Sequence, residues 1–202
     1  ILPTNTLHII DLYSGKSRQT VDASTFTSSV AADSKRIYAP SNGDLFTLDH
    51  SGSALWKYET SGAYATTPTL GYDLIYFASY DRHIYCLDRK GELRWKTKTP
   101  DIIKTPLALR YSMLFALSQD AWISALNPLT GRTIWRKKLF EADAYMPAFR
   151  RNFILFADSS SQVTAISAQE GEIKWKLDLP AIPTTPPITC GDTFFVGTEE
   201  GL

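Results

Sequence analysis

The segment from Ala125 to Trp135 reads ALNPLTGRTIW, and in it a tryptophan follows a glycine by four residues. The same spacing recurs along the chain at Gly52 and Trp56, Gly91 and Trp95, Gly131 and Trp135, and Gly171 and Trp175. Successive tryptophans of these pairs are 39, 40 and 40 residues apart. A period of about 40 residues indicates a repeat protein in which each repeat forms one supersecondary unit.

A second marker has the same period, because a proline follows each of these tryptophans after about a third of a repeat. These prolines are Pro68, Pro106, Pro147 and Pro186. Between the markers lie a short apolar run, a polar turn and an alternating run, as in residues 74–88. Alternation with aromatic and β-branched residues predicts strands, and four antiparallel strands per repeat predict a blade of a β-propeller. The expected fold is therefore an all-β propeller.

The repeats divide the chain into blades of one propeller domain, residues 1–202. Complete blades are expected at 23–60, 61–99, 100–139 and 140–179. The end segments, 1–22 and 183–202, supply complementary halves of a further blade, which predicts a five-bladed ring with one blade shared by the two termini. A ring closed in this way has no exposed sheet edges. An excerpt from a six- to eight-bladed propeller remains the alternative.

The segment around each tryptophan resembles the docking motif of pyrroloquinoline-quinone-type repeats, AxDxxTGxxxW. The best match is Ala125, Asn127, Thr130, Gly131 and Trp135. The next repeat matches at Ala165, Gly171 and Trp175, with Ser167 and Glu170 at the positions of the usual Asp and Thr. The motif decays toward the N-terminus, where Asp11 and Gly15 are kept and Gln19 replaces the tryptophan. The resemblance implies a quinoprotein-like propeller.

The docking residues have a structural interpretation that does not depend on the family. A small residue and a glycine leave a shelf on one blade, and a tryptophan of the neighbouring blade covers it and donates its indole N–H to a backbone acceptor. The aspartates near the glycines fix turns through side-chain hydrogen bonds to the backbone. The residues assigned to this interblade docking are Gly52, Trp56, Gly91, Trp95, Ala125, Gly131, Trp135, Ala165, Gly171 and Trp175.

Composition and motifs argue against several functions. Lys and Arg number 21, as do Asp and Glu, so no net charge attracts nucleic acid. No apolar run is long enough for direct membrane insertion. Cys86 and Cys190 lie in no metal or redox motif, and no hydrolase or phosphate-binding motif is found. Quinone enzymes of the resembling family use an adjacent cysteine pair and a calcium set, which the sequence lacks. We expect no catalytic residue, no metal site and no cofactor.

The turns on one face of the propeller, called the top, are the remaining candidates for binding. They join the second strand of each blade to the third and the fourth strand to the next blade. The possible partner-binding residues there are Tyr80, Arg82, Asp120, Trp122, Tyr145 and Glu199.

Trp122 is the only tryptophan outside the docking motif. It either contacts a partner or lies flat on its own blade. The role of a cluster of basic residues is open as well, because it forms either a solvated face or a site for an anionic partner. Its members are Arg132, Arg136, Lys137, Lys138, Arg150 and Arg151.

The sequence favours a non-enzymatic scaffold for protein–protein interaction, similar in repeat to the propeller lipoprotein that assists outer-membrane protein assembly. We expect a protein partner, a monomer or weak oligomer, and a periplasmic or other extracytoplasmic location. The chain opens at Ile1, as expected of a processed or excised piece. A small-ligand or glycan-binding propeller is the alternative, although the top turns SNGD, SYDR, SQDA, SSSQ and TEEG differ from one another. A fragment of a quinone-dependent dehydrogenase is the least supported alternative.

Overall fold

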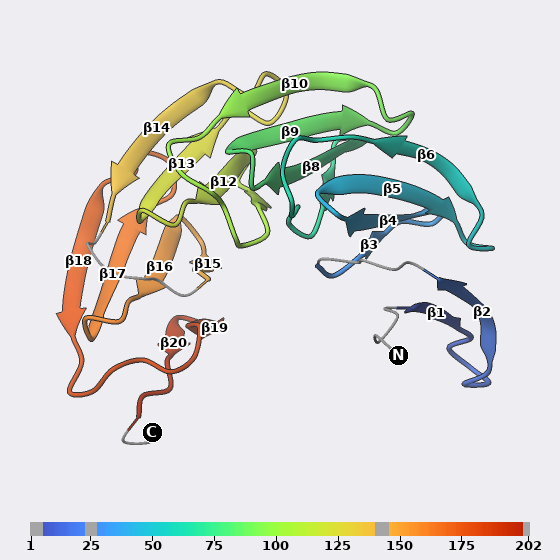
Figure 1. Cartoon of the computed structure of the whole chain (residues 1–202). Helices are drawn as coiled ribbons and strands as arrows, with labels where there is room; N and C mark the ends of the chain where they lie inside the picture. Colours follow the sequence, from blue (N-terminus) through green and yellow to red (C-terminus); the bar gives the residue numbers. More distant parts are fainter. Residues whose placement is uncertain (1–5, 23–27, 140–145, 200–202) are drawn as a thin grey trace. The chain divides into compact units, whose positions relative to one another are not determined.

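The computed structural model describes residues 6–22, 28–139 and 146–199. Within these residues all helix or strand structure is β, in four four-stranded antiparallel sheets and two hairpins (Figure 1). The predicted all-β fold of four-stranded propeller blades is thus confirmed. The chain divides into two compact units, Ile1–Leu109 and Arg110–Leu202.

The first unit contains a hairpin and two blades. The hairpin pairs β1 (Thr6–Ile10) with β2 (Ser17–Asp22). The first blade has the order β3 (Ala31–Ala32), β4 (Arg36–Ser41), β5 (Asp44–Asp49) and β6 (Ala54–Tyr58). The second blade has the order β7 (Thr69–Gly71), β8 (Leu74–Ser79), β9 (His83–Asp88) and β10 (Leu93–Lys98).

The second unit has the same organisation. A blade that begins at the unit boundary consists of β11 (Ala108–Arg110), β12 (Met113–Leu117), β13 (Trp122–Leu126) and β14 (Thr133–Lys138). The next blade consists of β15 (Ala148–Arg150), β16 (Phe153–Ala157), β17 (Gln162–Ser167) and β18 (Ile173–Asp178). The last hairpin pairs β19 (Ile188–Cys190) with β20 (Thr193–Phe195).

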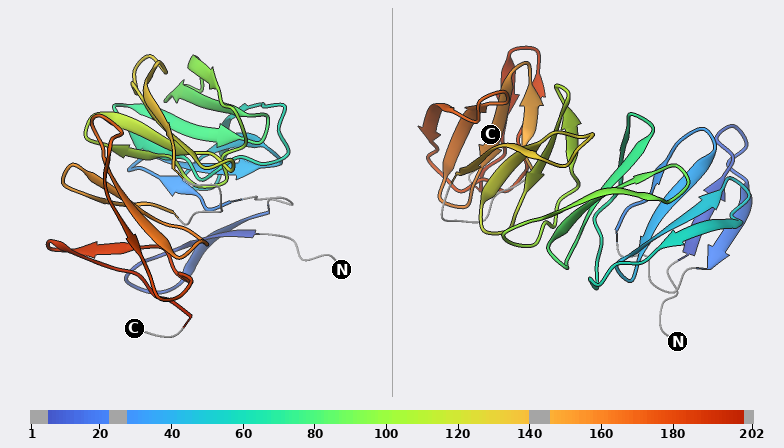
Figure 2. Two further views of the ribbon diagram at one scale, coloured as in Figure 1. Left: turned by 90° about the vertical axis from the view of Figure 1, so that its left-hand side faces the viewer. Right: turned by 90° about the horizontal axis from the view of Figure 1, so that it is seen from above.

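Within each four-stranded blade we call the strands A to D in chain order, and we use the same letters in the hairpins. Strands B and C form the middle of each sheet and are mostly buried, whereas strands A and D form its two edges and strand D is mostly exposed. Figure 2 shows the sheets from two further sides. The outer strands carry many cations, for example RKK at residues 136–138, and charged edges discourage pairing with other chains. The cationic residues of strand D therefore have a structural explanation.

The turns show why these sequences form hairpins. Asn42 and Gly43 both have positive φ, 50° and 83°, in the turn between strands B and C of the first blade. Two successive positive φ values are typical of the type I′ turn that matches the twist of paired strands. A β-bulge lies between strands C and D in every blade, for instance between Ala125 and Leu126. The bulge lies directly before the glycine turn that the sequence repeats.

The docking tryptophans contact the glycine turn of the following blade. In the first unit the Trp56 indole lies where a Cβ on Gly91 would stand, 2.8 Å from that position, and its Nε1 donates to the Arg89 carbonyl at 3.2 Å. In the second unit Trp135 lies 2.5 Å from the Cβ position of Gly171 and donates to the Ala168 carbonyl at 3.0 Å. Only glycine allows this close approach.

Gln19 makes the equivalent contact where the motif has lost its tryptophan. A Cβ on Gly52 would meet Val21 at 2.6 Å and the Gln19 amide at 3.1 Å. The β1–β2 hairpin therefore packs on the first blade through the same glycine shelf as the complete blades use.

The small residue of the motif has a different role from the expected one. Ala125 lies directly opposite Trp135 of its own blade, and Ala165 lies opposite Trp175. Directly opposed residues of paired strands point to the same face, so the alanine lies beside its own tryptophan and not on the shelf that receives a neighbour's. Because the alanine is small, a side chain of strand B can contact the tryptophan across strand C. The ring centroids of Phe115 and Trp135, for example, are 6.0 Å apart.

The same set of opposed side chains on strands B, C and D explains why a cysteine is buried in the second blade. Cys86 lies between Tyr76 and Trp95 on strands B and D of the second blade, and their rings are 6.0 Å apart. Burial raises the pKa of the Cys86 thiol to about 12, so it stays protonated at neutral pH. Cys86 therefore acts as a small core residue, and both it and the exposed Cys190 are free thiols.

A polar network adds to the first contact between blades. The Asp33 carboxylate accepts hydrogen bonds from Arg89 at 2.8 Å and from the Tyr38 hydroxyl at 3.0 Å, and also from the backbone N–H groups of Lys35 and Arg36. Burial raises the pKa of Asp33, but the hydrogen bonds and the charge of Arg89 outweigh this effect and hold it below its ordinary value. The ionised carboxylate thus links the two blades.

Replacing Asp33 with asparagine is expected to lower the free energy of unfolding by about 1 kcal/mol at neutral pH, because solvent screens part of the ion pair. Because the pKa of Asp33 is lower in the folded state, its ionised carboxylate stabilises the fold at pH values above the ordinary pKa of 3.8. This stabilisation is lost as the pH falls through the folded-state pKa. Urea unfolding at about pH 7 and about pH 3 should therefore show a difference that shrinks in acid. Asp73→Asn, in the corresponding turn of the second blade, is the control, and a pH-independent difference would contradict the assignment.

The two end hairpins form separate two-stranded sheets in the structure. The five-bladed ring with a shared blade therefore stays a prediction, and some of its proposed segments, residues 1–5, 23–27, 140–145 and 200–202, lie outside the described residues.

Candidate functional site

The top-face residues lie in turns of both units. In the first unit Tyr80 and Arg82 belong to the β8–β9 turn. In the second unit Asp120 precedes β13, Trp122 begins it, and Glu199 follows β20. Tyr145 lies outside the described residues.

Tyr80 is half of an aromatic pair. Its ring centroid is 5.2 Å from that of Tyr64, at an interplanar angle of 45°, and its backbone N–H donates to the Tyr64 carbonyl at 2.9 Å. Tyr64 is 48% exposed. Arg82 extends from the same turn, with 56% of its side chain exposed and a 3.7 Å ion pair to Asp101. Tyrosine and arginine are, together with tryptophan, the residue types that are enriched at the energetic centres of protein interfaces.

The base under this pair is tightly packed backbone. Gly62, two residues before Tyr64, has no room for a side chain, because a Cβ there would lie 2.2 Å from Ser79 Oγ and 2.7 Å from the Asp81 N. A Cβ on Gly43 would lie 1.5 Å from the Gly62 carbonyl oxygen. Thr60 Oγ1 donates to the Gly43 carbonyl at 2.7 Å. We call Tyr64, Tyr80 and Arg82 on this base the tyrosine platform.

Sequence reasoning missed Tyr64, although a signal for it exists. Tyr64, Ile102 and Ile182 each lie four residues before the blade proline. Tyr64 and Ile182 are 48% and 41% exposed, and Ile102 is half-buried. The link before Pro147 has Asp143 at this position, so three of the four links carry an apolar side chain there. Aligning the repeats on the proline could have shown this pattern.

Trp122 is covered by its own blade. The Arg136 guanidinium lies 4.4 Å from the centre of the indole ring, in a cation–π contact between β13 and β14. The ring is half-buried. This geometry matches the alternative in which Trp122 lies flat on its own blade, and it gives Arg136 a role within the fold.

The basic cluster is partly used within the second unit. Arg151 lies 2.9 Å from the Asp192 carboxylate, and Arg150 donates to the Gly191 carbonyl. These contacts join the β15–β16 turn to the β19–β20 turn. With Arg136 on Trp122, they favour a structural role for these cations over a site for an anionic partner.

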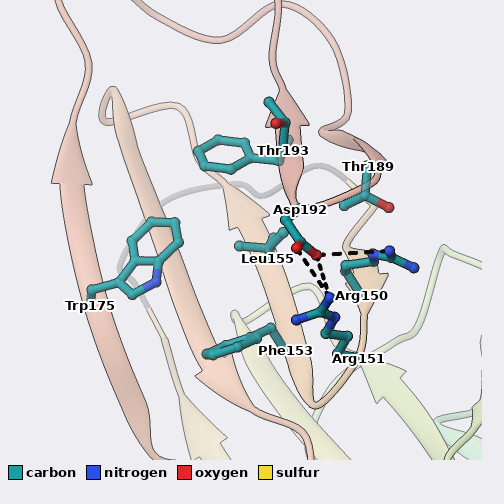
Figure 3. Close-up of a pocket in the computed structure, with 9 residues that line it drawn as sticks. Arg150, Arg151, Phe153, Leu155, Trp175, Thr189, Asp192 and Thr193 are labelled. Atoms are coloured by element: carbon teal, nitrogen blue, oxygen red, sulfur yellow. Dashed lines mark hydrogen bonds and ion pairs between the residues drawn. The ribbon is translucent and has the colours of Figure 1, made fainter.

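A pocket of about 310 Å³ lies between the β15–β18 blade and the β19–β20 hairpin, both in the second unit (Figure 3). Trp175 forms one wall, and Arg151 and Asp192 meet at the other side (Figure 3). The residues that line it are Arg150, Arg151, Phe153, Leu155, Trp175, Thr189, Asp192, Thr193 and Phe194. The volume is at the lower end of the range of small-ligand sites.

The described residues contain no cluster of three or more His, Cys, Asp or Glu side chains that could hold a metal ion. No helix among these residues is long and apolar enough to cross a membrane. The Tyr85 hydroxyl donates a hydrogen bond to the Asp81 carboxylate at 2.5 Å. Burial is the main cause that raises the pKa of Tyr85 above its ordinary value, and this hydrogen bond adds to it. Such a hydroxyl stays protonated and stabilises the core.

The blades and their glycine–tryptophan contacts define a β-propeller of quinoprotein-type repeats. The sequence model of the family described as outer membrane protein assembly factor BamB matches residues 4–118 and 119–202, so the chain belongs to this family. The crystal structure of BamB from Moraxella catarrhalis is similar, with a TM-score of 0.74 and 18% sequence identity. The alignment covers 95% of this chain and 63% of that one, so the chain spans less than two thirds of that BamB. A search of curated proteins gave no match.

Proposed function

We propose that the chain is a non-enzymatic scaffold of the cell envelope that holds a protein partner on its top face during outer-membrane protein assembly. The tyrosine platform is the observation that carries this proposal. The family supports the process, because its description names an assembly factor. The platform supports the mode of action, because it offers a surface for binding and no group poised for chemistry.

The platform has the properties of an interface anchor. Tyr64 exposes about half of its surface, yet its carbonyl is fixed by the Tyr80 N–H and Gly62 holds its backbone against the next turn. A preformed surface loses little conformational entropy on binding. Arg82 adds a charged group that a partner carboxylate or carbonyl can engage, since its own ion pair is long, at 3.7 Å.

The double variant Tyr64→Ala with Tyr80→Ala is expected to weaken binding to the outer-membrane assembly complex of the same bacterium at least about tenfold, which corresponds to about 1.4 kcal/mol. Surface plasmon resonance with the immobilised chain and a purified complex that lacks its own copy of the protein measures this effect. Circular dichroism melting should show that the variant stays folded, since the substituted rings are at the surface.

The matched control is Tyr72→Ala with Tyr111→Ala. These tyrosines are 54% and 39% exposed and lie in turns between strands A and B, at the other end of strand B. Their loss is expected to leave binding unchanged. An equal loss of binding in both double variants, or none in the platform variant, would refute the platform as the docking site.

A further inference from the structure

Two arginines of the first unit depart from the pattern of the repeat. Arg36 begins strand B of the first blade, a position at which the other complete blades have Leu74, Met113 and Phe153. Arg89 follows Asp88 in the glycine turn of the second blade, and the same position in the other turns is occupied by Leu12, His50, Pro128 and Ala168. Departures from a local pattern are expected mainly at functional or strained sites. These two positions are therefore candidates for a binding site.

Contacts between the first two blades hold both guanidinium groups in place. Arg36 Nη1 donates to the Arg89 carbonyl. Arg89 Nη1 donates to the Asp33 carboxylate and to the Tyr38 hydroxyl, each at 2.8 Å. A guanidinium group carries five N–H donors, so each arginine keeps donors that these contacts do not use. Both cations are thus oriented in advance, which lowers the entropy that a ligand would have to order.

The two arginines line a pocket of about 380 Å³ between the first and second blades. The other residues of its lining are Asp33, Ser34, Lys35 and Asp73. Asp33 is paired with Arg89 at 2.8 Å. Within the part of the chain that the structure describes, Lys35, Arg36 and Asp73 form no ion pair. The pocket therefore presents two unmatched cations, on Lys35 and Arg36, and one unmatched carboxylate, on Asp73.

We propose that this pocket binds a phosphate monoester that carries an amine, with phosphoethanolamine as the simplest example. The free donors of Arg36 and Arg89 bind the phosphate oxygens, because the planar fork of a guanidinium group fits them. A phosphate monoester carries a charge of about −1.5 to −2 at pH 7, which matches the unpaired cations of Lys35 and Arg36. The ammonium group of the ligand pairs with the Asp73 carboxylate.

The lining selects against other kinds of small ligand. Every residue of the lining is polar, so an apolar ligand would find no apolar side chain to cover it. A phosphate ester without an amine would face the Asp73 carboxylate, and like charges repel each other. A carboxylate ligand carries a single negative charge and would leave one of the two unmatched cations without a partner. The volume of the pocket lies at the lower end of the range of small-ligand sites.

The test is an NMR titration of the ¹⁵N-labelled chain with phosphoethanolamine, in which the Nε–H signals of Arg36 and Arg89 report on the site. Both signals are expected to move in a saturable manner. Monoethyl phosphate, which lacks the amine, is expected to bind at least about tenfold more weakly. Asp73→Asn removes the partner of the amine and is expected to abolish this preference, while asparagine tolerates positive φ and keeps the turn.

Arg36→Leu tests the phosphate contact, and leucine is the residue that begins strand B in the second blade. This variant is expected to bind both phosphate esters at least about tenfold more weakly. Thermal melting shows whether it stays folded, and the ligand preference of Asp73→Asn tests the proposal independently of it.

Lys90→Leu is the matched control, because Lys90 is exposed and follows Arg89 in the same turn but does not line the pocket. It is expected to leave the affinity unchanged. Unchanged affinity in Arg36→Leu, an equal loss in Lys90→Leu, or equal affinity of the unsubstituted chain for the two phosphate esters would overturn the proposal. Glycerophosphoethanolamine is a diester with one negative charge and is expected to bind more weakly than phosphoethanolamine. Equal or tighter binding of this diester would overturn the assignment to a monoester and indicate a lipid headgroup.

Discussion

Replacing Trp135 with alanine is expected to lower the free energy of unfolding by about 3–5 kcal/mol, the range for removal of a large packed aromatic side chain. The loss has two sources. The indole fills the space above Gly171 and contacts the Phe115 ring, so its removal leaves a cavity between two blades. The Ala168 carbonyl also loses its 3.0 Å hydrogen bond. Guanidinium unfolding followed by circular dichroism measures the change.

Ile134→Ala is the control for this experiment. Ile134 is on the same strand and is 51% exposed, so its truncation is expected to change the free energy of unfolding by less than about 0.5 kcal/mol. Trp135→Phe separates the two sources, because it keeps an aromatic ring and removes the N–H donor. A loss of less than about 1 kcal/mol for Trp135→Ala would mean that the ring does not fasten the blades together.

Gly43→Ala is expected to destabilise the protein by about 2–5 kcal/mol, because it combines two costs. A φ of +83° is unfavourable for a residue with a Cβ, and the new Cβ would lie 1.5 Å from the Gly62 carbonyl oxygen. That oxygen is backbone, so the link before Tyr64 must move. The variant is therefore expected to weaken partner binding as well, through displacement of the tyrosine platform.

The same substitution at Gly191 isolates the conformational cost. Gly191 has a φ of +57° and nothing within 4 Å of its Cβ position, so Gly191→Ala is expected to cost only about 1–2 kcal/mol. Thermal melting of both variants gives the comparison. Equal losses would show that the Gly43 turn does not press on Gly62 and that the platform lacks a rigid base.

Much of the fold was predictable because its signals are local and repeat. Alternating apolar residues specify strands, and the Gly–Trp pairs mark the turn between strands C and D of each blade. The candidate site was harder to predict from the sequence. Tyr80 and Arg82 were found from the turn that contains them, whereas Tyr64, their neighbour in space, was missed because it lies in a link segment 16 residues before Tyr80.

The sequence by itself determined the repeat and the four-stranded blade, because the period of the apolar residues shows which segments are strands. Only the tertiary structure decided what the residues of the motif and of the turns contact. The alanine of the motif lies beside its own tryptophan, Trp122 lies under Arg136, and Gly43 abuts a carbonyl of another turn. These contacts depend on how one sheet packs on the next, and the positions of backbone atoms across such an interface are not encoded in a local pattern of apolar and polar residues.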